Sequence, residues 1–119
     1  MKEFERSNEI AQYVYQALKS KTDEPIKVLN VTEITTIADI FIIVTAGNTR
    51  AVAALADEVE DKLQEQGYMQ IGKEGYNTAR WILLDFNGVM VHIFHKEEAE
   101  FYNLDKLWID GEVMDLEIK

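Results

Sequence analysis

The sequence predicts an α/β domain in which a mixed β-sheet is packed with helices, and three observations support this fold class. Asn87-Gly88 separates two apolar runs and is the strongest short signal for a β-hairpin. Residues 40–45 read IFIIVT, a β-branched run typical of a central strand buried on both faces. Residues 3–19 and the stretch between Asn48 and Gly67 instead repeat apolar residues at helical spacing.

The N-terminal part of the chain is predicted to form a helix and then a strand. Apolar residues fall at helical spacing within residues 3–19, at Ile10, Val14, Ala17 and Leu18. Pro25 lies shortly after this segment and favours its termination. Residues 26–32 alternate as a strand does and precede the apolar run at 40–45. The order begins as helix, strand, strand.

The second helix is expected to open at Gly47-Asn48-Thr49, with Asn48 or Thr49 as its cap. Its apolar stripe consists of Val52, Leu55, Ala56, Val59 and Leu63. Gly67 stands at the expected C′ position and closes the helix. The junction lacks both glycine patterns of phosphate-binding loops, so a helix cap explains it better than an anion site does.

The second half of the chain is predicted to add three strands and a helix. A short strand is expected at residues 68–71, a loop at Gly72 to Gly75, the hairpin at 81–95 and a helix at 97–103. The hairpin pair must be antiparallel, whereas the helix after the 40–45 strand allows a parallel crossover. We expect one domain over residues 1–109 and a loose tail at 110–119, where no pattern is clear.

The two-residue turn at Asn87-Gly88 determines the register of the hairpin. On one face it pairs Phe86 with Val89, Leu84 with Val91 and Ile82 with Ile93. On the other it pairs Asp85 with Met90, Leu83 with His92 and Trp81 with Phe94. The first face is purely apolar and is expected to press on a helix. The second mixes aromatic rings with a carboxylate and an imidazole, so it could be core, a binding surface or a catalytic floor.

Composition limits the classes of protein to which this chain can belong. It has 119 residues, 47% of them hydrophobic, which suits one globular domain. The longest apolar run is far too short to span a bilayer, and the N-terminus lacks the apolar stretch of a signal peptide. The absence of cysteine excludes disulfides, thiolate zinc sites and thiol nucleophiles. We therefore expect a cytoplasmic protein.

The formal net charge is −10, from 22 acidic and 12 basic residues, without a basic cluster. Because affinity for nucleic acid comes mainly from Lys and Arg, little direct nucleic-acid contact is expected. A strongly acidic chain is attracted to basic partners, although a soluble acidic surface explains the same charge.

Candidate chemistry centres on His92, His95, Asp85 and Asp39. Residues three apart on a strand point to opposite faces, so His92 and His95 cannot share a metal, and we expect no metal site. No cofactor is expected either. His92 is expected to bond a neighbour, for example Asp85, and such a pair could orient a general base, although no nucleophile stands near. Nucleotidyl transfer would need carboxylates two apart on a strand, and Phe41 breaks that spacing after Asp39.

The segment after the hairpin is rich in aromatic and apolar side chains: Phe101, Tyr102, Leu104, Leu107 and Trp108. Core packing is the default for such a cluster. Tyr and Trp are also enriched at interface hot spots, and Trp81 and Phe94 add to the aromatic surface.

Four blocks of the sequence together resemble the bacterial ribosomal silencing factor, or Iojap-like, family: DIFIIVTAGNTRAVAALADEVEDKL, EG, WILLDF and VMVHIFHKEEAEFYNLDKLW. They begin at Asp39, Glu74, Trp81 and Val89, and the resemblance runs from about residue 4 to 109. At Ala46-Gly47-Asn48 the family more often has Gly-Asn-Ser. The tail after Ile109 lies outside the pattern.

The resemblance implies a translational repressor without enzymatic activity. Such proteins bind ribosomal protein L14 (uL14) on the large subunit and sterically block its joining to the small subunit. The implied fold is related in topology to nucleotidyltransferases, without their catalytic carboxylates. Homodimers are also known for this family's fold.

We predict that the uL14-binding surface is the mixed hairpin face with the C-terminal aromatic segment beside it. Its expected residues are Glu74, Trp81, Asp85, Met90, His92, Phe94, Tyr102, Leu104 and Trp108. Aromatic side chains would supply buried contact, and the acids would pair with basic groups. A nucleotidyltransferase-type enzyme using Asp39, Asp85 and His92, and a plain homodimerisation module, are the alternatives.

Overall fold

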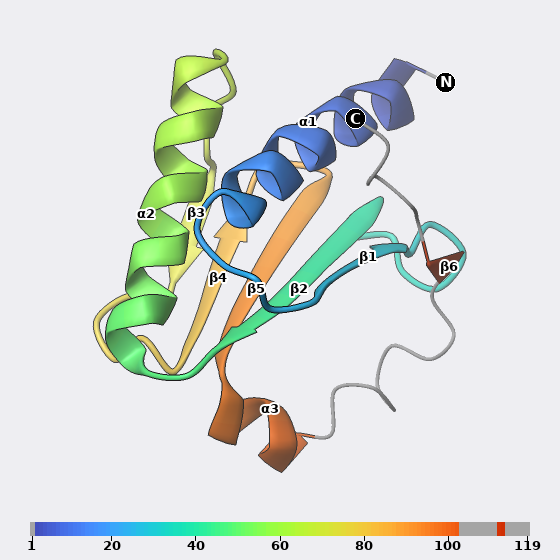
Figure 1. Ribbon diagram of the computed structural model, residues 1–119. Helices are drawn as coiled ribbons and strands as arrows, with labels where there is room; N and C mark the ends of the chain where they lie inside the picture. The colour runs from blue at the N-terminus through green and yellow to red at the C-terminus, as the bar shows by residue number, and fades with distance from the viewer. Residues whose placement is uncertain (1, 103–111, 114–119) are drawn as a thin grey trace.

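The computed structural model describes residues 2–102 and 112–113, and within them one mixed sheet carries two long helices on one face (Figure 1). The strands of the described residues lie in the order β3 (Gly72–Glu74), β4 (Trp81–Asp85), β5 (Val89–His95), β2 (Ile40–Ala46), β1 (Ile26–Asn30) and β6 (Glu112–Val113). The predicted α/β class with a mixed sheet is confirmed. In these ranges no helix is long and apolar enough to cross a membrane.

The centre of the sheet is β2 (Ile40–Ala46), as the apolar run predicted. It pairs in parallel with β5 (Val89–His95) and antiparallel with β1 (Ile26–Asn30). Six of its seven residues are buried, because helices cover one face and a second apolar cluster covers much of the other.

The two long helices lie side by side on the same face of the sheet (Figure 1). They are α1 (Lys2–Lys19) and α2 (Thr49–Glu65). The predicted stripe of α2 is buried, and Asn48 is its N-cap, accepting a 2.8 Å hydrogen bond from the Ala51 backbone N–H. The apolar hairpin face packs under these helices as predicted, with all six of its residues at most 1% exposed.

The hairpin joins β4 (Trp81–Asp85) to β5 in the register that the turn predicted. Asn87 and Gly88 both have positive φ, +59° and +114°, as a two-residue hairpin turn requires. A Cβ at Gly88 would stand 2.5 Å from Ser7 Oγ, because α1 packs closely on this turn. Ser7 Oγ donates to Asp39 Oδ2 at 2.9 Å, so the start of β2 joins the same contact.

The sequence misplaced one strand and missed another. The edge strand β3 is Gly72–Glu74, where a loop was expected, and the strand expected at residues 68–71 is wrong. β3 forms there because its residues pair with Leu83 to Asp85 of β4. Glu112–Val113 forms β6, which pairs with Leu29 and Asn30 in a part of the chain that showed no pattern.

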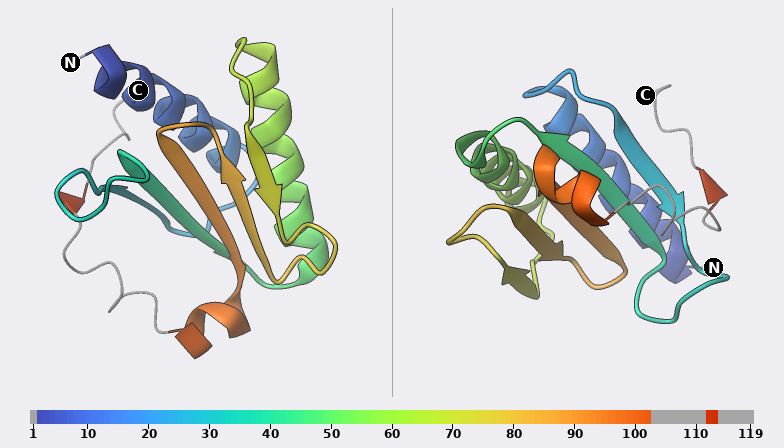
Figure 2. Two further views of the ribbon diagram at one scale, coloured as in Figure 1. Left: turned by 180° about the vertical axis from the view of Figure 1, so that it is seen from behind. Right: turned by 90° about the horizontal axis from the view of Figure 1, so that it is seen from below.

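The face of the sheet opposite α1 and α2 is called here the second face (Figure 2, left). The short helix α3 (Lys96–Tyr102) follows β5 and lies at one end of it. Around β2 this face holds a buried cluster formed by Leu29, Val31, Ala38, Phe41, Ile43 and Phe94. The second face is therefore core near β2, and its exposed part lies toward β4 and β3.

Candidate functional site

Among the residues whose side chains the structure describes, Trp81 is the large aromatic one that the second face presents to solvent. It is 39% exposed and begins β4. Its ring stacks on Phe94 of β5, with centroids 4.7 Å apart, and its Nε1 donates to His92 Nδ1 at 3.3 Å. Phe94 is completely buried. A buried ring and a buried acceptor therefore hold one indole in a defined orientation at the surface.

His92 lies beneath this indole, at 5% exposure. Burial lowers the pKa of His92 from the ordinary 6.5 to about 4, because desolvation penalises the imidazolium form. The neutral ring keeps Nδ1 as an acceptor for the Trp81 N–H. Its ring also meets Phe41 edge-on, at 5.0 Å between centroids. His92 at neutral pH is thus an uncharged support for Trp81.

The expected pairing of His92 with Asp85 is wrong. Asp85 Oδ1 accepts the backbone N–H of Asn87 at 2.9 Å, so this carboxylate caps the hairpin turn. Asp85 lies opposite Met90, whereas His92 lies opposite Leu83, which leaves the two side chains diagonal across the hairpin. His92 and His95 stand at alternating positions of β5, on opposite faces, as predicted.

Strand pairing brings Glu74 beside the hairpin residues of the second face. Glu74 pairs with Leu83, and Leu83 pairs with His92, so the three form one row across three strands. Glu74 is exposed and Leu83 is half-buried. Leu83 was not among the predicted contact residues, although the hairpin register already placed it on this face. Its apolar side chain lies between the acidic edge and the aromatic centre.

We call the accessible part of the second face the Trp81 patch, defined by Glu74, Trp81, Leu83, Asp85 and Met90. His92 and Phe94 were predicted to contact the partner, and this is wrong, because the structure places both side chains below this patch. With 5% and 0% exposure they cannot offer surface to a partner. Trp81 stacks on Phe94 and bonds to His92, and the buried cluster of this face, with Phe41, packs against both. His92 and Phe94 position Trp81 instead.

Three of the predicted residues come from the C-terminal aromatic segment. Tyr102 is the last residue of α3, at the end of the second face where β5 leads into that helix. Leu104 and Trp108 lie outside the described residues. That the hairpin face and the C-terminal segment form one binding surface therefore stays a prediction.

Backbone contacts fix the start of β4, where Trp81 stands. Gly75 has φ +83°, and a Cβ there would lie 2.0 Å from the Trp81 carbonyl oxygen, so this close approach requires glycine. The Arg80 carbonyl accepts the His95 N–H at 2.8 Å. Arg80 also bonds Glu98 Oε1 of α3 at 2.8 Å, and this contact raises the pKa of its guanidinium. The indole thus stands on a fixed main chain.

The residues of the enzymatic alternative serve structural roles. The Asp39 carboxylate accepts from Ser7, Asp85 accepts from the turn backbone, and His92 accepts from Trp81. Among the described residues, no three His, Cys, Asp or Glu side chains are grouped so that they could hold a metal ion. The arrangement suits recognition by an aromatic anchor between two acids better than proton transfer.

Comparison with known proteins gives consistent matches over most of the chain. A family model described as "Ribosomal silencing factor during starvation" matches residues 4–119, and so extends through the tail at 110–119. Proteins named ribosomal silencing factor RsfS are 40% identical in Halalkalibacterium halodurans, over 93% of this chain and 95% of that protein, and in Bacillus subtilis, over 85% and 86%. A Zea mays protein named Iojap, chloroplastic, is 32% identical over 57% of this chain and 29% of its own length.

Two solved structures share the fold. A Chromobacterium violaceum protein superposes with a TM-score of 0.81 at 31% identity, covering 85% of this chain and 84% of its own. A Bacillus halodurans protein superposes with a TM-score of 0.80 at 37% identity, covering 91% and 98%.

Proposed function

The chain belongs to the family of ribosomal silencing factors, and we propose that it binds the large-subunit protein uL14 and sterically blocks subunit joining. The family consists of ribosome regulators that are not enzymes. Repression of translation then follows from occupancy of one surface of the large subunit, without any covalent step.

The observation that carries this proposal is the preorganised indole of Trp81. A tryptophan that is 39% exposed, yet stacked on Phe94 and bonded to His92, loses little conformational freedom when a partner covers it. Tryptophan is also among the residues most enriched at interface hot spots. Leu83 and Met90 beside it are half-buried and extend the apolar contact.

Charge supports a protein partner over RNA. The net charge of −10 repels the phosphate backbone that covers most of the ribosome, so binding requires a basic ribosomal protein. Glu74 and Asp85 flank the apolar centre of the Trp81 patch. We expect them to pair with basic side chains of the partner at its rim. Such rim charges add on-rate and orientation more than affinity.

Three further expectations accompany this function. A regulator of ribosomes resides where ribosomes are, so we propose that the protein is cytoplasmic. The relation of its topology to nucleotidyltransferases, without their paired carboxylates, and formation of a homodimer are implied by the family resemblance and remain predictions.

Co-sedimentation with purified large subunits tests the proposal. Trp81→Ala is expected to lose more than about tenfold in affinity, the usual cost of removing a hot-spot anchor, while its circular dichroism stays unchanged. The matched control is Ile37→Ala, which removes an aliphatic side chain that is 67% exposed in the loop between β1 and β2. Equal binding by both variants would refute the proposed surface.

A further inference from the structure

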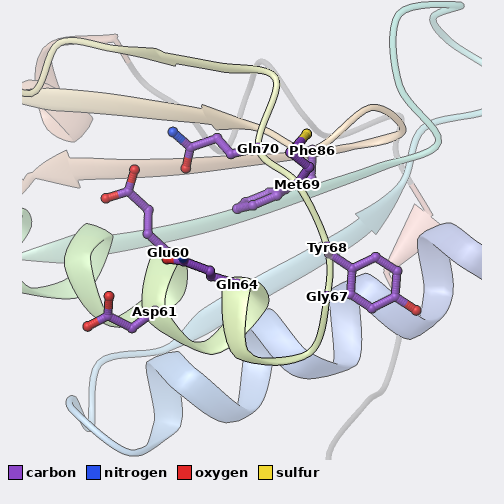
Figure 3. A pocket seen from close by; sticks show the side chains of 8 residues that line it. All are labelled: Glu60, Asp61, Gln64, Gly67, Tyr68, Met69, Gln70 and Phe86. Carbon is purple, nitrogen blue, oxygen red and sulfur yellow. The ribbon is translucent and has the colours of Figure 1, made fainter.

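A hollow of about 520 Å³ lies on the helix-bearing side of the sheet, away from the Trp81 patch (Figure 3). It is bounded by the C-terminal turns of α2, by residues 67–70 and by the end of the hairpin at Phe86. Its lining consists of Glu60, Asp61, Gln64, Gly67, Tyr68, Met69, Gln70 and Phe86. None of these side chains carries a positive charge.

The polar lining offers hydrogen-bond acceptors. Gln70 Oε1 is buried and has no hydrogen-bond partner in the described part of the chain, which is costly for an amide oxygen unless a donor reaches it. Asp61 is exposed, and its carboxylate adds a full negative charge. The Glu60 carboxylate already forms an ion pair with Lys73, with 3.1 Å between Glu60 Oε2 and Lys73 Nζ. The hollow therefore favours a ligand that is rich in donors and positively charged.

The end of α2 adds a fixed electrostatic contribution of the same sign. The helix ends at Glu65, beside the hollow, and its dipole places partial negative charge at this end. There the Lys62 carbonyl accepts a hydrogen bond from the Gln66 N–H, and the Leu63 carbonyl accepts from the N–H groups of Gln66 and Tyr68. A cation in the hollow would be stabilised by both the helix terminus and the Asp61 carboxylate.

The apolar lining suits the stem of a long side chain. Met69 is 79% exposed, unusual for so large an apolar residue, and the Phe86 ring forms another wall. Methionine adapts its shape to what it contacts. Methylene groups can pack against these two residues while a charged head group reaches the acceptors.

We propose that this hollow receives an arginine side chain from an extended segment of a partner protein. A guanidinium presents five donors in a plane and can therefore satisfy several separated acceptors, whereas an ammonium acts as a point charge. A protein segment fits better than a free cation, because the hollow adjoins β3, which is an edge strand of the sheet and can be lined by an extended chain. Ile71, 62% exposed between the hollow and β3, extends an apolar surface for the rest of the segment.

This second surface does not depend on the proposed role of the Trp81 patch. The two lie on opposite sides of the sheet, so a partner can occupy one while the other stays free. Substitutions in the hollow leave Trp81, His92 and Phe94 unchanged, and a failure at either surface can be assigned to that surface.

The direct test is a titration of the ¹⁵N-labelled protein followed by heteronuclear NMR. The probe is the capped tripeptide acetyl-Gly-Arg-Gly-amide, and its counterpart carries citrulline, which has nearly the same shape without the charge. We expect the arginine peptide to shift the amides of residues 67–70 and the Gln70 side-chain NH₂, with a Kd of about a few mM. The citrulline peptide is expected to bind at least about threefold more weakly.

Two variants and one control sharpen this test. Gln70→Leu removes the buried acceptor and Asp61→Asn removes the charge, and each is expected to weaken the arginine peptide about threefold or more. Asp23→Asn, an exposed acid outside the hollow, should bind as the unaltered protein does. Equal binding of both peptides, shifts spread over the whole acidic surface, or no shift up to about 10 mM would overturn the proposal. Tighter binding of spermidine at the same amides would overturn the assignment to a protein side chain.

Discussion

Trp81 and His92 face each other diagonally across the β4–β5 hairpin, and the indole Nε1 donates to the imidazole Nδ1 at 3.3 Å. The donor residue is 39% exposed and the acceptor residue 5%. The bond therefore connects a surface anchor to the interior. It requires the neutral imidazole, since a protonated ring has a hydrogen on both nitrogens.

Acid should consequently weaken the fold through His92. Burial holds the pKa of His92 at about 4 in the folded protein, against an ordinary 6.5. Between these values the unfolded chain binds a proton that the folded protein does not, so stability falls as the pH falls. We expect about 2 kcal/mol of unfolding free energy from this group to be lost between neutral pH and about pH 5.

Urea unfolding at both pH values, for the unaltered protein and for His92→Asn, measures this effect. Asparagine can still accept the Trp81 N–H through its side-chain oxygen but does not titrate. The variant should therefore show the smaller loss on acidification. If the stability of the two proteins depends equally on pH, the pKa of His92 is not lowered in the folded protein, and the account is contradicted.

The hairpin turn depends on glycine at position 88. Alanine there would force a residue with a Cβ into φ +114° and place that atom 2.5 Å from Ser7 Oγ. Gly88→Ala is therefore expected to cost at least about 2 kcal/mol of unfolding free energy. Gly47→Ala is the control, because a Cβ at Gly47 would have no atom within 4 Å and should change stability by less than about 0.5 kcal/mol. Thermal unfolding that ranks the two variants equally would contradict the close packing of α1 on the turn.

Asp85 caps the hairpin turn, and we propose that its carboxylate also contacts the partner. Asp85→Asn keeps an oxygen that can accept the Asn87 N–H but loses the charge. If this carboxylate meets a basic group of uL14, the variant should bind large subunits about threefold to tenfold more weakly at low salt, with an almost unchanged melting temperature. Asp23→Asn, exposed elsewhere, should bind normally. A lower melting temperature with unchanged binding would assign Asp85 to the turn alone.

The elements governed by local chemistry could be predicted from the sequence. Asn87-Gly88 admits one short turn, and that turn determines every pair in the hairpin. The run at residues 40–45 could be recognised as the central strand because it is apolar without alternation, which is typical of a strand covered on both faces. The Asn48 cap likewise depends on contacts within one turn of helix.

Features set by distant parts of the chain could not be predicted in this way. β3 forms at Gly72–Glu74 because β4 offers its edge there, although residues 68–71 have the more strand-like composition. β6 pairs with a strand far away in the sequence. The hairpin pattern placed His92 and Phe94 on the second face but could not show that side chains from β1, β2 and β4 pack on them and bury them.

Subunit joining on a sucrose gradient measures the central claim most directly. Purified protein is incubated with large subunits, small subunits are then added, and the monosome peak is compared for the unaltered chain, Trp81→Ala and Ile37→Ala. We expect the unaltered chain and Ile37→Ala to sediment with large subunits and to suppress monosomes, whereas Trp81→Ala stays at the top and lets monosomes form. Normal monosome formation in the presence of the unaltered protein would contradict steric blocking through the Trp81 patch.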